Sequence, residues 1–177
     1  MSEGKKMQAA GMNATPQPDR PALPNGYGIP EDTEGTLPWS FVEEQMAAAR
    51  NYWIATVRPD SRPHAMPVWG AWLDGKLYIE GSPHTRRHRN LVANPHVVAH
   101  LESGDQVVIV EGEAYESGKP DATMGKRLSQ SFIHKYASSG YSPGPDAWDN
   151  GGLYVIYPKK VFAWTKFPED TTRWRIT

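Results

Sequence analysis

The sequence predicts a mainly β fold of the α+β class, in which six or seven antiparallel strands form a barrel flanked by helices. The first observation is a series of short apolar runs separated by turn signals. The second is that these runs follow one another closely, with turns such as Asp74-Gly75, a strong two-residue hairpin signal. The third is that 177 residues are enough for one domain with a sizeable core. Together they favour a closed antiparallel barrel over a parallel α/β sheet.

The beginning of the chain differs in composition from the rest. Residues 1–35 contain five prolines and several glycines but few large apolar side chains. This composition predicts an extended Pro-rich arm with little structure of its own. The folded domain is therefore expected over residues 36–177.

Three segments have helical spacing. In the first, Trp39, Val42 and Met46 share one face, which predicts a helix that packs inward through that face. Ser40 and Glu43 have the spacing of a capping box at its N-terminus. The third segment has an apolar side formed by Met124, Leu128, Phe132 and Ile133. The predicted helices cover residues 36–50, a short segment from Thr85 to Asn94, and residues 121–137.

The apolar runs predict strands that pair with their neighbours along the chain. A turn at residues 158–160 is expected to separate the last two runs, and residues 173–176 are expected to add a short terminal strand. Pro67 lies inside one run, which suggests an edge, a bulge or a strand approached by a ligand. The expected strands cover residues 52–58, 64–73, 76–80, 96–101, 106–115, 153–157 and 161–166.

A basic segment precedes and begins the short second helix. Cations crowd its first turn, where the helix dipole is already positive, so an anion bound at this end would explain the arrangement. The backbone N–H groups and polar side chains would then converge on a phosphate or carboxylate. The alternative is a solvated basic helix that packs through Leu91 and Val92. The polar side chains concerned are Ser82, Thr85, Arg86, Arg87 and Arg89.

The composition excludes several classes of protein. Lys+Arg total 19 against 20 Asp+Glu, which is not the basic excess of a nucleic-acid-binding protein. The chain has no cysteine, so disulfides and thiolate metal sites are excluded. No apolar run is long enough to span a membrane, and no signal-peptide pattern is present at the start. A cytoplasmic protein that binds neither nucleic acid nor membrane is therefore expected.

Histidine pairs and aromatic residues are the remaining candidates for a site. His84 and His88 stand four residues apart, as do His96 and His100, but no third ligand or HExxH motif accompanies them. No metal site is therefore predicted. Seven tryptophans and eight tyrosines are many for this length, and such side chains suit cores, interfaces and planar ligands.

The order of three features resembles a known family. A helix and a hairpin containing residues 53–69 come first, and a Val-x-Val-x-Gly strand at residues 108–112 comes last. Between them stands the segment Ser82-x-x-Thr85-Arg86-Arg87-x-Arg89-Asn90-Leu91-x-x-Asn94-Pro95-x-Val97. Over roughly residues 39–166 this layout resembles the pyridoxamine-phosphate-oxidase-like split-barrel family, including its flavin- and deazaflavin-dependent oxidoreductases.

The resemblance implies a six-stranded antiparallel split barrel that forms a homodimer and binds its cofactor at the dimer interface. It implies that the cofactor phosphate lies on the helix after the third strand and the ring along the second strand. Trp148 is a candidate from the other subunit, and His64 and Tyr141 are candidates for proton donation. The cofactor-binding residues implied in this way are His64, Met66, Pro67, Val68, Trp69, Ser82, Thr85, Arg86, Arg87 and Trp148.

The resemblance also suggests a function. The C-terminal Arg and His pair of true pyridoxamine-phosphate oxidases is missing, which argues against vitamin B6 chemistry. The density of arginine suits the deazaflavin coenzyme F420, whose tail adds several carboxylates, better than flavin mononucleotide (FMN), which is the alternative. We expect hydride transfer between this cofactor and a small organic substrate. A non-catalytic carrier of flavin, deazaflavin or tetrapyrrole is the competing hypothesis.

Overall fold

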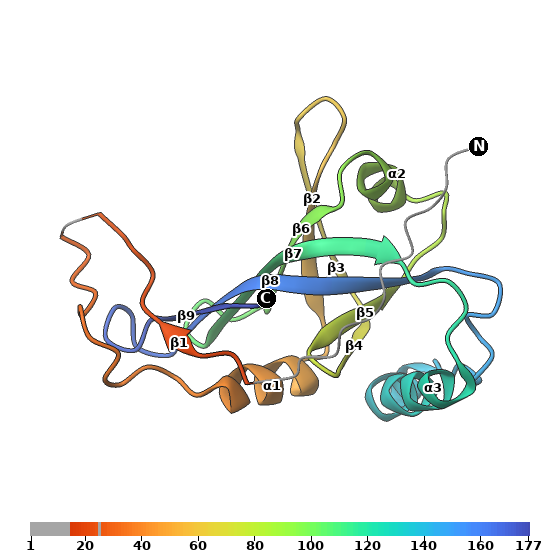
Figure 1. The fold of residues 1–177 in the computed structure, drawn as a ribbon. Coiled ribbons are helices and arrows are strands. Elements are labelled where there is room, and N and C mark those ends of the chain that lie inside the picture. The colour runs from red at the N-terminus through yellow and green to blue at the C-terminus, as the bar shows by residue number, and fades with distance from the viewer. Residues whose placement is uncertain (1–14, 25) are drawn as a thin grey trace.

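The computed structural model describes residues 15–24 and 26–177, which form an antiparallel sheet with three α-helices (Figure 1). Within these residues no helix has both the length and the apolar character needed to cross a membrane. The elements in chain order are β1 (Pro18–Asp19), α1 (Trp39–Ala48), β2 (Tyr52–Val57), β3 (Pro63–Val68), β4 (Gly70–Leu73), β5 (Lys76–Glu80), α2 (Arg86–Ala93), β6 (His96–His100), β7 (Val107–Glu116), α3 (Ala122–Tyr136), the 3-10 turn η1 (Ala137–Ser139), β8 (Leu153–Trp164) and β9 (Thr172–Arg175).

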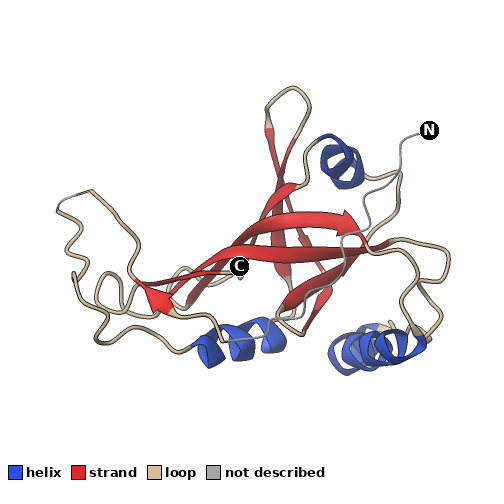
Figure 2. Ribbon diagram, in the orientation of Figure 1, coloured by secondary structure: helices blue, strands red, loops and turns tan. Residues whose placement is uncertain are grey.

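The described strands form one antiparallel sheet that bends round on itself without closing. Hydrogen bonds connect the strands in the order β1-β9-β8-β7-β6-β2-β3, and β5 pairs with both β4 and β8. One residue, Trp69, joins β3 to β4, and no ladder pairs these two described strands, so the sheet stays open between them (Figure 2). The predicted mainly β split-barrel architecture is confirmed, although the sheet has nine strands where six were expected.

Two strand boundaries differ from the prediction. The run 64–73 is divided at Trp69 into β3 and β4, whereas the expected turn at 158–160 lies inside β8. A β-bulge between Glu111 and Gly112 accommodates Pro158, because the ladder shifts register there and continues. Gly112 is required at this point, since a Cβ would stand 2.2 Å from the carbonyl oxygen of Tyr157. The prediction of a turn was wrong because a proline beside a bulge does not end a strand.

The last turn of α3 secures the break between β3 and β4. The Tyr136 hydroxyl accepts a hydrogen bond from the Gly70 N–H at 2.9 Å and lies 2.8 Å from the Arg50 carbonyl oxygen. The Lys135 ammonium donates to the carbonyl of Ala49 at 2.9 Å and to the hydroxyl of Tyr52 at 2.6 Å. The backbone N–H and carbonyl of Gly70, at the break, therefore find partners on α3, which lies much later in the sequence.

The C-termini of α1 and α3 are capped by each other's cations. Lys135 binds the carbonyl of Ala49 after α1, and Arg50 donates through Nη1 to the carbonyl of Lys135 at 2.8 Å. Cations are favourable at this end of a helix because the dipole is negative there. Burial lowers the pKa of Lys135 to about 8, and within the described residues its partners are neutral oxygens.

The N-terminus of α1 corrects another expectation. The N-cap is Pro38, which forms no side-chain cap, so the predicted capping box is wrong. Ser40 lies inside the helix, and the Glu43 carboxylate instead accepts hydrogen bonds from the indole N–H groups of Trp39 and Trp72, both at 2.8 Å. The local capping signal was overridden because two buried indoles need an acceptor at this position.

Two apolar clusters fill the molecule. The larger lies between α1 and the inner face of the sheet, and it buries the predicted face of Trp39, Val42 and Met46. The smaller lies between α3 and the outer face of β4, β5 and β8. Leu128 and Phe132 are buried there as predicted, but Ile133 is 39% exposed.

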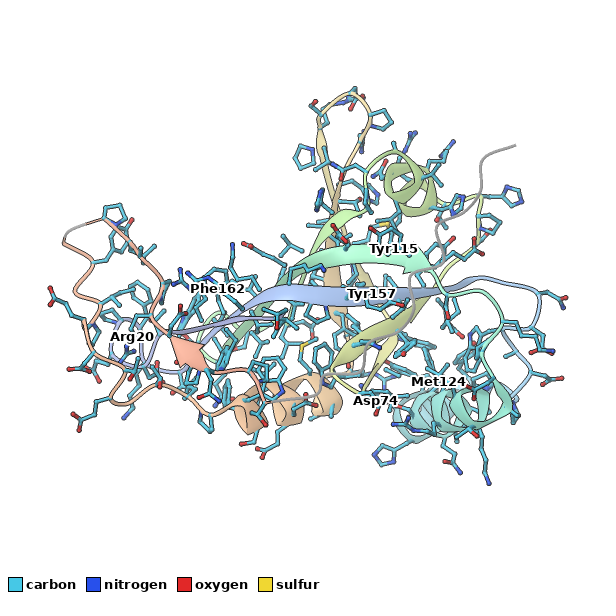
Figure 3. All side chains as sticks on the ribbon, viewed as in Figure 1. Arg20, Asp74, Tyr115, Met124, Tyr157 and Phe162 are labelled. Carbon is cyan, nitrogen blue, oxygen red and sulfur yellow. The ribbon has the colours of Figure 1, made fainter. Side chains whose placement is uncertain are left out.

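Part of the N-terminal arm lies against the end of the sheet. β1 pairs with β9, with Pro18 opposite Trp174. Beside it, the guanidinium of Arg20 donates hydrogen bonds to four carbonyl oxygens and thereby joins two distant segments (Figure 3). These carbonyls belong to Asp32, Glu34, Glu169 and Thr171. Residues 1–14 of the predicted arm lie outside the described residues.

Candidate functional site

The N-terminus of α2 begins with a well-formed cap. The Thr85 hydroxyl oxygen accepts a hydrogen bond from the His88 N–H at 3.1 Å and donates to the Ser82 carbonyl at 2.9 Å. The Ser82 hydroxyl in turn accepts from the His84 N–H at 3.2 Å. The predicted Thr85 cap is therefore confirmed. Apart from the His88 N–H, which Thr85 already caps, the N–H groups of the first turn have no intrahelical acceptor, so they are available to an anion.

Four basic residues belong to α2 and to the β2–β3 hairpin, two parts of the fold that contact each other, and we call them the basic cluster. β2 pairs with β3 so that His64 stands opposite Thr56, and Asn90 of α2 donates to the Thr56 hydroxyl at 2.9 Å. Burial lowers the pKa of His64, and the charges of three arginines lower it further. The basic cluster consists of His64 and these arginines, Arg58, Arg86 and Arg87.

The basic cluster has more hydrogen-bond donors than the protein satisfies. The Nε of Arg58 is buried and has no partner among the described residues. Asp60 stands in the hairpin, but it is paired with Arg62 at 2.6 Å, and this guanidinium is the main reason for its lowered pKa. An anionic ligand is the chemical group that such a set of donors fits. No group of three or more residues suited to hold a metal ion occurs in the part of the chain that the structure describes.

Arg87 has a different environment from the one expected. It is only 8% exposed, and its Nη2 donates to the Glu80 carbonyl oxygen at 2.5 Å. The guanidinium lies over Gly81, where a Cβ would stand 2.3 Å from Nη2. Arg87 therefore holds the end of β5 against the first turn of α2, whereas Arg86 and Arg89 are exposed. The idea that Arg87 is a freely accessible fork at the helix end needs correction, because most of its surface is already covered.

The strand expected to contact the cofactor ring presents two faces. His64, Met66 and Val68 lie on one face, because they stand opposite the inward-facing residues of β2. Met66 is 51% exposed on that face. Pro67 and Trp69 belong to the other face, and Trp69 stacks on Tyr136 with ring centroids 4.5 Å apart. The structure thus brings His64, Met66 and Val68 to one surface and directs the side chain of Trp69 away from it.

The comparison with family models agrees with this geometry. The model described as "Pyridoxamine 5'-phosphate oxidase" matches residues 40–164, which include β2 to β8 and the whole basic cluster. The chain belongs to the pyridoxamine 5'-phosphate oxidase family. Comparison with curated proteins finds no match.

Solved structures with a similar fold include proteins with several different cofactors in their names. An FAD-binding protein from Mesorhizobium loti is 20% identical, with a TM-score of 0.54 and coverage of 77% of this chain and 93% of that chain. An F420 reductase is 22% identical, with a TM-score of 0.50 and coverage of 78% and 98%. A heme binding protein from Mycobacterium smegmatis is 17% identical, with a TM-score of 0.56 and coverage of 74% and 55%. At these identities the similarity shows the fold alone.

Within this pyridoxamine 5'-phosphate oxidase family fold, two predicted site residues lie apart from the basic cluster. Trp148 is 2% exposed in the apolar cluster under α3, so its ring is enclosed by its own chain. Its indole N–H and the Tyr141 hydroxyl both donate to Oε1 of Glu80 at 2.6 Å. Burial, with a smaller effect of Glu80, raises the pKa of Tyr141. The Tyr141 hydroxyl is therefore engaged by Glu80, and the contribution of Trp148 to a partner's site stays a prediction.

Glu80 is the residue that sequence reasoning missed. Its carboxylate binds Tyr141 and Trp148, and its carbonyl binds Arg87, so it connects the α3 cluster with the first turn of α2. The signal was a single acidic residue at the end of an apolar strand, just before the basic segment. Such a residue is ordinary at a strand end. Only the fold shows that the carboxylate and the backbone carbonyl of Glu80 bind different parts of the protein.

Proposed function

We propose that this protein is an oxidoreductase that binds a flavin or deazaflavin with its phosphate at the N-terminus of α2. The observation that supports this most directly is the basic cluster, whose donors exceed its acceptors beside free N–H groups of a helix. Thr85, Ser82 and Arg86 would hold the phosphate, since their polar groups lie at the helix start. Membership of the family supports the same class of cofactor.

The protein's own residues would bind and orient the cofactor. Met66 and Val68 offer apolar surface on the face of β3 that also bears His64, which suits one side of a planar ring. The bound cofactor supplies hydride transfer to a small organic substrate. His64 is the candidate for proton exchange, but its lowered pKa keeps it neutral in the ligand-free protein at neutral pH.

We propose coenzyme F420 over FMN, because the exposed Arg86 and Arg89 exceed what one phosphate needs. Titration followed by intrinsic Trp fluorescence is expected to show tighter binding of F420 than of FMN. The difference should shrink as salt rises, because exposed charges are screened over about 10 Å at 0.1 M. Riboflavin, which has no phosphate, is the control and should bind most weakly. Equal affinities, or a preference for FMN, would favour the FMN-dependent alternative.

We also propose that the protein is a homodimer formed through the outer face of β2, β6 and β7. This face contains an open hollow of about 720 Å³ whose lining includes Ala55, Val57, Val98 and Ile176. Acidic and basic side chains border the same hollow, and Glu111 and Lys160 pair with each other at 2.9 Å, so a second copy would cover the apolar lining within a polar rim. These side chains are Glu111, Glu113, Lys159, Lys160 and Arg175.

Light scattering tests this assembly. The parent protein should have the mass of a dimer at micromolar concentration, and Val98→Glu should be monomeric because it places a charge in the apolar hollow. Val92→Glu is the control, since Val92 is 74% exposed on α2. A monomeric parent that binds its cofactor fully would contradict the proposal.

A non-catalytic carrier is the second candidate, favoured by the fold similarity to a heme binding protein. The two candidates differ in turnover. An oxidoreductase re-oxidises its bound reduced cofactor faster when an organic acceptor is added, whereas a carrier protects the cofactor from the acceptor.

A further inference from the structure

Arg58 is the member of the basic cluster that sequence and family similarity leave without a role. It is the first residue after β2, where the turn of the hairpin begins, and it is partly buried. Its backbone N–H donates to the Arg62 carbonyl at 2.9 Å, which closes the turn. Its Nε is buried without a partner among the described residues. A buried guanidinium N–H without an acceptor costs free energy, so an acceptor is expected when the protein is in its working state.

The charges around Arg58 show which kind of acceptor is missing. Arg58 follows Thr56 by two residues, and the Thr56 hydroxyl accepts a hydrogen bond at 2.9 Å from Asn90, which stands one helical turn after Arg87. The charges of Arg58, Arg86 and Arg87 all act on His64 in the same hairpin. The acid of the hairpin, Asp60, is occupied by Arg62, whose Nε and Nη2 donate to it at 3.0 and 2.6 Å. The hairpin and α2 therefore bring cations toward one region from two sides, with the hairpin's own carboxylate already neutralised. Like charges held in this way are stabilised by an anion between them.

We propose that Arg58 is a binding residue for the anionic group at α2 and contacts it from the hairpin side. This inference rests on the proposed function and deepens it, because it makes the site two-sided. The group is a phosphate held between the hairpin and the helix, with the planar fork of Arg58 pairing two of its oxygens. A lysine presents a point charge at this position and cannot reproduce that pairing.

A consequence follows for His64. The cations that lower its pKa in the ligand-free protein are neutralised when a phosphate dianion binds beside it. The pKa of His64 then rises, so binding takes up a proton and is tighter at lower pH within the range where His64 titrates. Thr56 is the uncharged neighbour on this side, with its hydroxyl 3.5 Å from Nδ1 of His64.

The experiment compares Arg58→Ala and Arg58→Lys with Arg62→Ala, a matched control from the same hairpin whose partner is Asp60. FMN affinity is measured by fluorescence titration, and riboflavin serves as the probe without phosphate. Arg58→Ala should weaken FMN binding by about tenfold or more, as loss of a hydrogen bond to a charged group implies, and leave riboflavin binding unchanged. Arg58→Lys should restore only part of the affinity, and Arg62→Ala should bind FMN within about twofold of the parent.

A second measurement separates this inference from the proposed function. Inorganic phosphate is titrated into the full chain while the His64 ring is followed by NMR at several pH values. The pKa of His64 should rise with phosphate in the parent and in Arg62→Ala but not in Arg58→Ala. If FMN and F420 fail to bind while phosphate still shifts His64 through Arg58, the proposed function fails and the inference stands. If Arg58→Ala binds FMN like the parent, or its His64 responds to phosphate like the parent's, the inference is wrong.

Discussion

Replacing Arg87 with alanine is expected to lower both the stability of the fold and the affinity for a phosphate-bearing flavin. Arg87 is 8% exposed and donates to the Glu80 carbonyl, so its removal leaves an acceptor without its donor and a space over Gly81. Loss of a hydrogen bond from a charged group costs about 1.5–3 kcal/mol, and the unfilled space adds to this. Because Arg87 positions the first turn of α2, phosphate binding should weaken with it.

Thermal melts and calorimetric titration with FMN measure the two effects. Arg89→Ala is the control for stability, since it removes the same charge from the exposed side of the same helix and should change the melting temperature little. From the sequence alone, the Arg87 variant would be expected to fold normally, because a cation at a helix N-terminus is unfavourable. An unchanged melting temperature for Arg87→Ala would show that the buried Arg87 side chain contributes nothing to the stability of the fold.

Tyr136→Phe is expected to destabilise the protein although it removes a single oxygen atom. The hydroxyl is the acceptor of the buried Gly70 N–H and also contacts the Arg50 carbonyl, while the ring stacks on Trp69. Phenylalanine keeps the stacking but leaves the Gly70 N–H without an acceptor, which costs about 1–3 kcal/mol. The loss of stability should be largest where β3 is followed by β4, because the unpaired Gly70 N–H lies there.

Urea unfolding provides the measurement for Tyr136→Phe, with the midpoint expected to fall and the slope to stay constant. Tyr157→Phe is the matched control, because Tyr157 is a partly buried tyrosine of β8 (Figure 3) whose hydroxyl has no hydrogen bond within the described part of the chain. Similar midpoints for the two variants would mean that the Tyr136 hydroxyl does not secure the break. Hydrogen exchange at Gly70 and its neighbours would locate the change.

The features that sequence reasoning predicted correctly are local. The Thr85 cap, the inward face of α1 and the strand pattern follow from spacings of a few residues, which the backbone geometry largely determines. The position of His64 opposite Thr56 also follows once the hairpin is recognised, because pairing across a short turn fixes the register.

The features that it missed depend on contacts between distant segments. Trp148 is enclosed because α3 and its following loop pack over Glu80, a residue 68 positions earlier in the chain. Arg87 is buried because the end of β5 passes beneath α2, which its own helix does not reveal. Pro158 remains in a strand because Gly112 of another strand makes room for it. In each case the deciding partner lies far away in the sequence, where local propensity has no information.

The central position of β8 has a consequence for how the protein is made. This strand pairs with β5, β7 and β9, so the two halves of the sheet meet only through it. While residues 153–164 are still inside the ribosome, the emerging chain exposes unpaired edges on both β5 and β7. Such unpaired edges favour aggregation until β8 pairs with them. The sheet can be completed only after β8 has left the exit tunnel, because β5 and β7 both pair with it.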